Sequence, residues 1–301
     1  MSEAADLSSP GRFDARYLAF LETVTQQRPS LHRYCARMTG SLTDGEDVAQ
    51  EVLLEAYLKL EQYDESRALK PWLFRIAHNR CIDFLRKRGV RLEAETAAGP
   101  ADRVETEHAA ALGLGSALEY LVVTLPAKER ACVLLKDVLD HSLEEIAELT
   151  DSTVGGVKAA LHRGRGKIKA SPAPVSFPAP ENSELVHLLS LYVDRFNRRD
   201  WPAVRELISA DARLRVAGRY AGALAESPYF TRYEQWPLAW QLAVGMVDGE
   251  PLVIVFEGDP NTWTRRWIVR LDATGNQIQR VSDYALCPWI LDSAAAVNLV
   301  A

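Results

Sequence analysis

The sequence predicts a multidomain protein in which two all-α helical domains are followed by an α+β domain. Through about residue 169 the apolar residues recur at helical spacing. The proline-rich stretch ASPAPVSFPAPE at 170–181 then predicts an interdomain linker. Beyond it, two helical segments precede several alternating runs that Gly and Asn turn signals separate. Helices followed by an antiparallel meander are typical of an α+β domain.

Charge is distributed unevenly along the chain. The protein has 301 residues, enough for two or three domains, and a net charge of −6. This acidic total argues against nucleic-acid binding by the chain as a whole. Basic residues nevertheless concentrate in 75–91 and 158–169, while the acids lie elsewhere. Such local asymmetry indicates two candidate surfaces for nucleic acid.

Cysteine spacing and hydropathy limit the cofactors and the compartment. The four cysteines lie far apart and form no CxxC or Cys/His cluster. We therefore expect no metal and no cofactor, and four small buried thiols in a reducing cytosol. The N-terminus lacks the pattern of a signal peptide, and no apolar run approaches the ~20 residues of a membrane span. These features predict a cytoplasmic protein that does not enter a membrane.

Three helices are expected before residue 61. The first two are Phe13–Gln26 and Pro29–Thr39, each with one apolar face. The third begins at a cap formed by Thr43 or Asp44. It is expected to bury Val48, Val52, Leu53, Ala56, Tyr57 and Leu60. Its outer face is acidic and polar, with Asp47, Gln50, Glu51 and Glu55.

The stretch Trp72–Arg88 predicts a helix with an apolar back and a basic front. It is expected to begin at Pro71 and to end at Gly89. The back comprises Leu73, Ile76, Ala77, Cys81, Phe84 and Leu85. The front carries Arg75, His78, Asn79, Arg80, Arg86, Lys87 and Arg88. Lys and Arg suit phosphates, and the amide of Asn79 can both donate to and accept from a base edge. Taken alone, the stretch favours a solvated amphipathic helix, and it is the neighbouring motifs that favour a functional one.

A second helical block is expected at 109–169, after an acidic, aperiodic linker at 93–108. In this block Pro126 opens one helix, and Ser142 caps a short helix with Glu145 at the capping-box position. After a tight turn, a helix at 154–169 carries outward-facing Lys158, His162, Arg163, Arg165 and Lys167. A short helix, a turn and a basic helix predict a helix-turn-helix, whose second helix enters the major groove.

The last domain is expected to begin with helices at Leu185–Arg198 and Pro202–Ile208. The alternating runs that follow predict five strands. These are Arg213–Val216, Leu238–Val247, Leu252–Glu257, Trp263–Leu271 and Ile278–Tyr284.

Four motifs occur in a fixed order: DGEDVAQEVLLEAY, PWLFRIAHNRCIDFLRKR, LPAKERACVLLKDV and SLEEIAELTDSTVGGVKAALHRGRGKI. In this order and spacing they resemble a bacterial RNA polymerase sigma factor of the extracytoplasmic-function (ECF) group, over about Phe13–Lys169. The resemblance implies sigma region 2 at 13–92, region 4 at 109–169 and a further domain at 182–301. It also implies that the chain is not an enzyme, and that it directs core RNA polymerase to promoter DNA.

The resemblance assigns roles to individual residues. Asp47, Gln50 and Glu51 would bind the β′ clamp helices of the polymerase, and region 4 would contact the β flap. Trp72, Arg75, Asn79 and Arg80, with Arg86, Lys87 and Arg88, would face the melted promoter element, where Asn79 holds a flipped base. Lys158, His162, Arg163 and Arg165 would read the upstream element as duplex. Where the family often has Thr-Val-Lys-Ser-Arg, this chain has Gly156-Val157-Lys158-Ala159-Ala160, so relatives do not predict its upstream sequence.

The third domain contains NRRDWPAVRELISADARLRV, which resembles the SnoaL-like, cone-shaped α+β fold shared with ketosteroid isomerase. The resemblance implies a domain that modulates sigma activity in cis, with a possible small ligand. Trp240, Trp267 and Asp283 are the candidate pocket residues, although most aromatic residues of this domain are expected to be core. Asp283 either points into the cone or faces solvent at a strand end.

Two other functions fit parts of the sequence. A one-component regulator would pair the helix-turn-helix with a ligand-sensing domain, but it has no use for the block Asp44–Arg88. An isomerase or cyclase would need a paired acid and base in the cone, and the sequence offers only Asp283. The motifs identify neither the promoter nor an anti-sigma partner.

Overall fold

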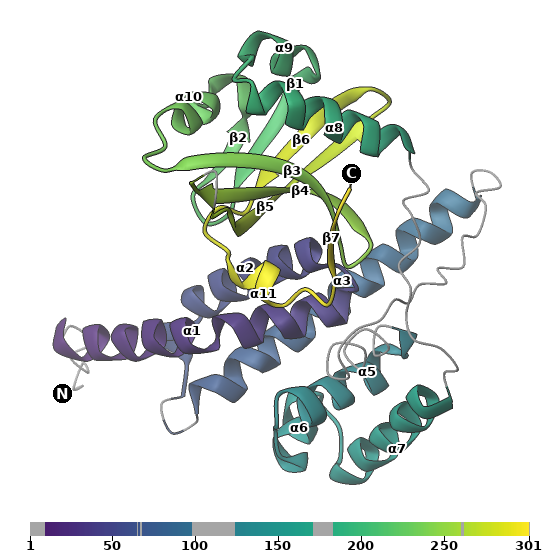
Figure 1. Cartoon of the computed structure of the whole chain (residues 1–301). Coiled ribbons are helices and arrows are strands. Elements are labelled where there is room, and N and C mark those ends of the chain that lie inside the picture. Colours follow the sequence, from purple (N-terminus) through teal and green to yellow (C-terminus); the bar gives the residue numbers. More distant parts are fainter. Residues whose placement is uncertain are drawn as a thin grey trace. The chain divides into compact units, whose positions relative to one another are not determined.

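The computed structural model describes residues 10–64, 66, 68–97, 124–170, 183–259 and 262–300. Contacts between residues divide the chain into two compact units. The first is all-helical and contains residues 10–40, 44–97 and 124–167, and the second contains the α+β domain from residue 183 (Figure 1). The predicted fold class is confirmed. Within the described ranges no helix is long and apolar enough to cross a membrane.

The helical unit begins with α1 (Pro10–Thr39), a single helix where the sequence predicts two. Pro29 lies inside it and removes one backbone N–H without ending the helix. The apolar face continues across the proline, since Phe20 is buried before it and Leu31 and Tyr34 are buried after it. Packing of this face therefore outweighs the local penalty, which is about 3 kcal/mol for an interior proline.

The next helix, α2 (Leu42–Leu58), starts before its predicted cap, so Thr43 and Asp44 lie in its first turn. Gly45 allows α2 to approach α1 closely. A Cβ at this position would come within 2.3 Å of the Cα of Ala36. The side chains that α2 buries include Val48, Val52 and Ala56, as predicted. A short 3-10 turn, η1 (Leu60–Gln62), follows.

The helix predicted at Trp72–Arg88 is α3 (Leu69–Ala97), which is longer at both ends. Pro71 lies in its first turn, and the helix continues through Gly89, where a Cβ would meet nothing within 4 Å. An interior glycine costs only about 1 kcal/mol relative to alanine, so it does not end a helix by itself. Residues 93–97 of the predicted linker are therefore helical, and 98–108 lie outside the described residues.

One position on α3 contradicts the predicted two-faced pattern. The pattern assigns His78 to the basic front, but the structure buries its side chain. Its Nδ1 lies 2.9 Å from the hydroxyl of Tyr34 on α1, so the imidazole has a polar partner inside the helical unit. Of the predicted back, Leu73, Ile76, Ala77 and Cys81 are buried, whereas Phe84 and Leu85 are half-buried.

The remaining helices of this unit are α5 (Ala127–Val133), α6 (Leu143–Leu149) and α7 (Val154–Ala170), and a π-helical turn, η3 (Leu134–Val138), extends α5. Ser142 and Glu145 form the predicted capping box at the start of α6. Gly164 lets α7 lie against α5, because a Cβ there would come within 2.9 Å of Val133. The helix predicted from residue 109 falls on residues that are not described up to 123.

The α+β domain begins with α8 (Ser183–Asn197) and α9 (Trp201–Glu206), followed by a seven-stranded sheet. The strand order is β2-β1-β6-β5-β4-β3-β7, in which β1 and β6 are parallel and the other neighbours are antiparallel. Helix α8 packs against β3 and β4 and covers one face of the curved sheet, which gives the predicted cone (Figure 1). The strands are β1 (Ile208–Val216), β2 (Tyr220–Ala223), β3 (Ala239–Val247), β4 (Glu250–Gly258), β5 (Thr264–Thr274), β6 (Gln277–Asp283) and β7 (Val297–Leu299).

Several short elements of this domain are absent from the sequence prediction. They are β2, β7, α10 (Tyr229–Glu234), α11 (Trp289–Asp292) and the 3-10 turn η4 (Leu224–Glu226). Each spans six residues or fewer, which is too short to display a helical or strand period.

Aromatic side chains fill the interior of the cone. Phe196 on α8 lies at their centre, with ring-centroid distances of 4.9 Å to Tyr233 and 5.5 Å to Trp240. Trp240 is buried in this core, and its indole N–H donates to the carbonyl of Tyr233. Most of these aromatic residues are therefore core, as predicted, and Trp240 is core too rather than a pocket residue.

Candidate nucleic-acid interface

The outward face of α2 combines acids with exposed apolar side chains. Asp47 and Gln50 are half-buried and Glu51 is exposed, on the stripe predicted for them. One and two turns later the same stripe carries Leu54 and Leu58, which are 60% and 68% exposed. We call Asp47, Gln50, Glu51, Leu54 and Leu58 the α2 face.

Tyr57 borders the α2 face and corrects a second prediction. The sequence pattern assigns it to the buried side, but its side chain is 49% exposed. Its ring meets that of Tyr17 on α1 edge-on, with centroids 6.1 Å apart. Exposed apolar side chains gathered on one helix indicate a contact surface for another protein. Sequence periodicity alone could not find this surface, because an apolar residue is by default assigned to the core.

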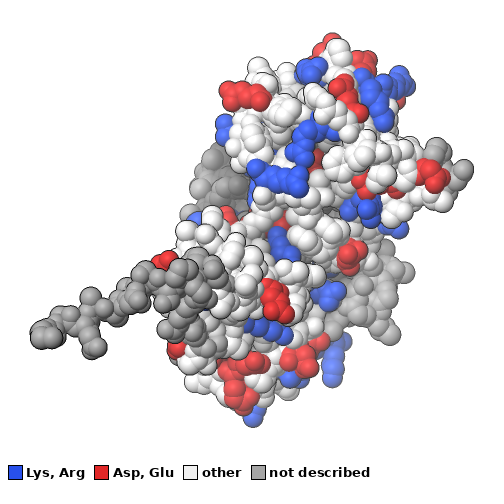
Figure 2. Space-filling view, turned by 90° about the vertical axis from the view of Figure 1, so that its left-hand side faces the viewer, with Lys and Arg blue, Asp and Glu red and all other residues white. Residues whose placement is uncertain are grey.

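Five residues of the predicted front of α3 are exposed, as the sequence predicts. Arg75 and Asn79 are exposed and lie one helical turn apart. Arg86, Lys87 and Arg88 are also exposed, further along the helix. Lys and Arg side chains are interspersed with Asp and Glu over the face shown in Figure 2, so no patch of one sign dominates this face. The front of α3 therefore presents one amide among several cations.

Trp72, at the start of this front, is half-buried and packs against the ring of Tyr63, with centroids 4.9 Å apart. Trp72 and Arg75 also line a hollow of about 320 Å³, and Glu145 and Glu148 of α6 line it with them. The sequence did not predict that acids of the second helical block face these two residues. Two carboxylates and a guanidinium therefore line the same hollow.

Arg80 is bound to acids of α2 and is not free on the front. Its Nε forms an ion pair with Oε2 of Glu55, and its Nη1 lies 3.8 Å from Oε2 of Glu51. The hydrogen bond with Glu55 raises the pKa of the arginine above its ordinary value. The structure thus brings Arg80 close to Glu51, which is predicted to serve a different partner, and to Glu55.

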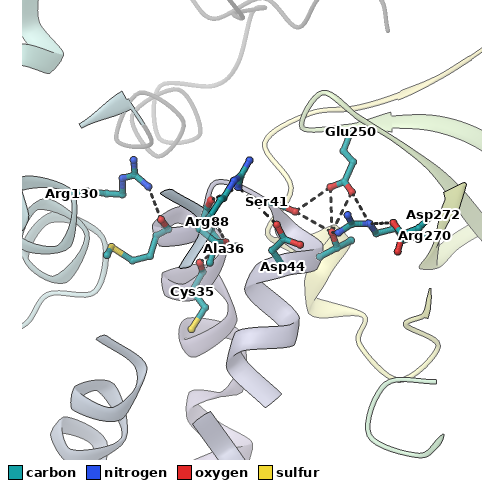
Figure 3. A network of polar contacts seen from close by, with 12 residues as sticks. Cys35, Ala36, Ser41, Asp44, Arg88, Arg130, Glu250, Arg270 and Asp272 are labelled. Carbon is teal, nitrogen blue, oxygen red and sulfur yellow. Dashed lines mark hydrogen bonds and ion pairs between the residues drawn. The ribbon is translucent and has the colours of Figure 1, made fainter. Parts of the chain in front are cut away.

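Two arginines satisfy carbonyls at the C-terminal end of α1 (Figure 3). Arg130 of α5 donates to the carbonyl of Met38 at 2.5 Å, and Arg88 of α3 donates to that of Thr39 at 3.4 Å. The last carbonyls of a helix have no partner within the helix and lie at its negative end, so cations stabilise them. Arg88 also lies 3.9 Å from Asp44, and it is therefore partly engaged within the fold.

On α7, the predicted recognition residues divide into two groups. Lys158 and His162 are exposed one turn apart. Arg163, by contrast, forms an ion pair with Glu129 at 2.9 Å, and Lys167 pairs with the same carboxylate at 2.8 Å. Hydrogen bonds from Lys167 and Arg163 hold the pKa of Glu129 below its ordinary value.

Arg165, also predicted to contact DNA, forms an ion pair with Asp137 of η3. Arg163 and Arg165 therefore bind α7 to α5 and to its extension η3. Lys158 and His162 are left as the two predicted side chains that project from the helix-turn-helix.

A buried carboxylate lies near the rim of the cone in the α+β domain. Asp283, at the end of β6, accepts hydrogen bonds from the hydroxyls of Tyr229 and Tyr233 at 2.9 and 2.7 Å and from the N–H of Ala285 at 2.9 Å. Burial raises its pKa, although these three donors oppose the shift. Of the two orientations that the sequence leaves open for Asp283, the structure shows the buried one, and both carboxylate oxygens accept hydrogen bonds.

Trp267 lies beside Asp283 along a small cleft of about 20 Å³. Its side chain is buried, and its indole N–H has no hydrogen-bond partner among the described residues. Of the three predicted pocket residues, the structure therefore brings Trp267 and Asp283 together and separates Trp240 from them. A cleft of this size accommodates about one water molecule.

Comparison with known families accounts for both helical blocks. The model of sigma-70 region 2 matches residues 23–91, and that of sigma-70 region 4 matches residues 116–168. SigW of Bacillus subtilis, an ECF RNA polymerase sigma factor, is 34% identical over 163 residues, which cover 50% of this chain and 87% of SigW. The chain belongs to the ECF sigma factors. It is accordingly a transcription factor and not an enzyme.

Relatives of this sigma factor differ in how far they extend. The ECF sigma factor SigG of Mycobacterium tuberculosis is 29% identical over 260 residues, covering 75% of this chain and 69% of SigG. That alignment is longer than the two sigma regions together, so it reaches the α+β domain. The crystal structure of the M. tuberculosis ECF sigma factor SigJ aligns with 88% of this chain at 15% identity and a TM-score of 0.36.

Proposed function

We propose that this sigma factor binds core RNA polymerase through the α2 face, opens promoter DNA with the front of α3 and reads duplex DNA with α7. The observation that carries the proposal is the presence of two exposed polar and basic helix faces in two separate sigma regions. One face is centred on Asn79 and the other on Lys158 and His162. A factor that binds a single duplex element would need only the second.

The polymerase contact is assigned to the α2 face. Asp47, Gln50 and Glu51 provide carboxylates and an amide, and Leu54 and Leu58 extend the surface with exposed apolar area. An apolar surface next to polar groups suits a stable protein interface, and its helical form suits the β′ clamp helices. Region 4 is proposed to contact the β flap.

Promoter opening is assigned to the front of α3. Asn79 is exposed and flanked along the helix by cations, so a base turned out of the stack can meet the amide while phosphates meet Arg75, Arg86 and Lys87. Trp72 supplies an aromatic surface at the start of the same front. In the structure Glu145 and Glu148 lie across the hollow from Trp72 and Arg75, and these acids must leave when DNA binds.

Duplex reading is assigned to Lys158 and His162 of α7. Both side chains are exposed on one side of the second helix of a helix-turn-helix, the element that enters the major groove. Arg163 and Arg165 are proposed to make only part of their possible contacts with DNA phosphates, because their guanidinium groups are paired with Glu129 and Asp137.

The α+β domain is proposed to modulate the sigma activity in cis. A proline-rich linker of about a dozen residues keeps it at high effective concentration near region 4. Its interior is filled by aromatic side chains, and two buried carboxylates already have partners: Asp283 accepts three hydrogen bonds, and Glu257 accepts from Trp236 and Arg266. Acid–base chemistry is therefore a poor explanation for the domain. The cleft at Trp267 has room for about one water molecule, so a small-ligand effector would have to widen it to enter the cone.

Run-off transcription with core polymerase on genomic fragments tests the sigma role. The full chain should direct discrete transcripts that core polymerase alone does not produce. Absence of any specific transcript over a whole-genome fragment library, with the protein shown to bind core polymerase, would argue for a different role.

Truncation after Lys169 tests the proposal for the α+β domain. At matched protein level, the truncated chain should transcribe from the identified promoter at a different rate from the full chain. Equal transcription by both, with and without candidate ligands, would remove the modulating role.

A further inference from the structure

One carboxylate on α2 is shared by two cations. Glu55 accepts from the ammonium group of Lys59 through Oε1 at 2.6 Å, and from the guanidinium of Arg80 through Oε2. Burial alone would raise the pKa of Glu55, but the hydrogen bonds from Lys59 and Arg80 bring it below its ordinary value. The carboxylate therefore stays ionised and keeps both partners.

The pair joins two surfaces with different proposed partners. Arg80 directly follows Asn79 on α3, and Glu55 lies one turn beyond Glu51 of the α2 face. The same guanidinium is 3.8 Å from Glu51, so it lies between both acids. Without Glu55, the Arg80 side chain would have Glu51 as its nearest anion.

Stability does not explain the pair well. The side chains of Arg80 and Glu55 are 39% and 19% exposed, and an ion pair that water still reaches contributes little to folding because water screens it. A guanidinium is, however, rigid and directional, and a bound carboxylate fixes where its remaining N–H groups point. Glu55 holds the Nε edge of Arg80, the residue that directly follows Asn79 in α3.

We propose that Glu55 is a positioning residue for promoter melting. It orients Arg80 so that the guanidinium contacts a phosphate of the unpaired strand next to the base held by Asn79. The inference rests on the proposed function and adds to it a residue to which the family resemblance gives no role. It also links the helix that binds polymerase to the helix that opens DNA.

The test measures binding of holoenzyme to a fluorescent single-stranded oligonucleotide that carries the non-template strand of the promoter found by run-off mapping. Glu55→Ala and Arg80→Ala should each weaken binding by about 3- to 10-fold. Each should lower the slope of log affinity against log salt by about 1, because one phosphate contact is lost. The double variant should bind no more weakly than Arg80→Ala alone. Lys59→Ala, which removes only the other cation, should bind like wild type.

Other outcomes would overturn the inference. If Glu55→Ala and Arg80→Ala weaken binding additively, Glu55 acts independently of Arg80. If the salt slope of Glu55→Ala is unchanged, or Lys59→Ala loses affinity equally, the role of Glu55 is structural. Asn79→Ala separates this inference from the proposed function. If Asn79→Ala loses affinity while Glu55→Ala and Arg80→Ala bind like wild type, only the positioning role is contradicted. Binding equal to wild type in all of these variants contradicts the assignment of α3.

Discussion

The hydroxyl of Tyr34 on α1 lies 2.9 Å from Nδ1 of His78 on α3, and both side chains are buried in the helical unit. Burial lowers the pKa of His78 to about 4, so the imidazole is neutral in the folded protein at neutral pH. A titratable group therefore lies on the buried side of α3, the helix proposed to open DNA. Protonation of His78 therefore opposes folding.

The pH dependence of stability follows from this shift. Above about pH 6.5 the imidazole is neutral in both folded and unfolded chains. Between about pH 6.5 and 4 the unfolded chain binds a proton that the folded chain excludes, so the free energy of unfolding should fall by up to about 1.4 kcal/mol per pH unit. Urea denaturation of wild type and His78→Gln from pH 7.5 to 4.5 checks this. The variant should lose stability less steeply, and parallel profiles would show that His78 is not the group responsible.

Gly45 is predicted to be irreplaceable at the junction of α1 and α2. A Cβ at this position would meet the backbone of Ala36 at 2.3 Å, so Gly45→Ala should lower the free energy of unfolding by about 1–3 kcal/mol or more. Gly89→Ala is the matched control, because nothing lies within 4 Å of its Cβ position and alanine favours a helix. Denaturation midpoints should fall for the first variant and hold or rise for the second. Equal midpoints would mean that α2 does not approach α1 as described.

Charge reversal on the α2 face should abolish polymerase binding without unfolding the protein. Asp47→Arg with Glu51→Arg places cations where the proposed interface requires anions, at positions outside the buried set of α2. Co-elution with core polymerase should be lost while helical content and melting temperature change little. Glu61→Arg, at an exposed acid on η1, serves as the control and should still co-elute. Retained co-elution of the double variant would remove the α2 face from the interface.

Lys158 and His162 are predicted to carry duplex recognition. Alanine at either position should weaken binding to the upstream element, by about 1–3 kcal/mol if the side chain contacts base edges, and leave stability unchanged. Arg163→Ala should also lower the melting temperature of the helix-turn-helix block, because it removes a partner of Glu129. Fluorescence anisotropy with a duplex probe, paired with thermal melts, separates the two effects. Equal loss of affinity and of stability in all three variants would contradict the division of α7.

Much of the fold could be predicted because periodicity reports burial over long segments. The apolar back of α3, the capping box at Ser142 and the order of helices and strands follow directly from residue spacing. Helix ends could not be predicted from Pro29 and Gly89, because local propensity penalises both residues and tertiary packing decides. The short elements around α10 were missed because six residues show no period.

The sequence predicts which residues of the candidate site are exposed, but not which residues form ion pairs with them. Asn79, Arg75, Lys158 and His162 are exposed where the sequence places them. The acids that bind Arg80, Arg163 and Arg165 lie 25, 34 and 28 residues away in sequence, so no local pattern reveals these ion pairs. His78 was misplaced because a histidine on a basic face resembles a surface residue until Tyr34 is brought to it by the fold.

The most direct test of the account is permanganate footprinting of promoter complexes formed by holoenzymes at equal occupancy. Promoter opening is assigned to α3, and reading of duplex DNA is assigned to α7. Asn79→Ala should lose reactivity of unpaired thymines while its protection of the upstream element matches wild type. The double variant Lys158→Ala with His162→Ala should lose protection of the upstream element. On a template whose melted region already carries mismatches, its complexes should still contain open DNA with reactive thymines. Loss of both signals together in Asn79→Ala, with the protein folded and bound to core polymerase, would contradict the assignment of separate roles to the two helices.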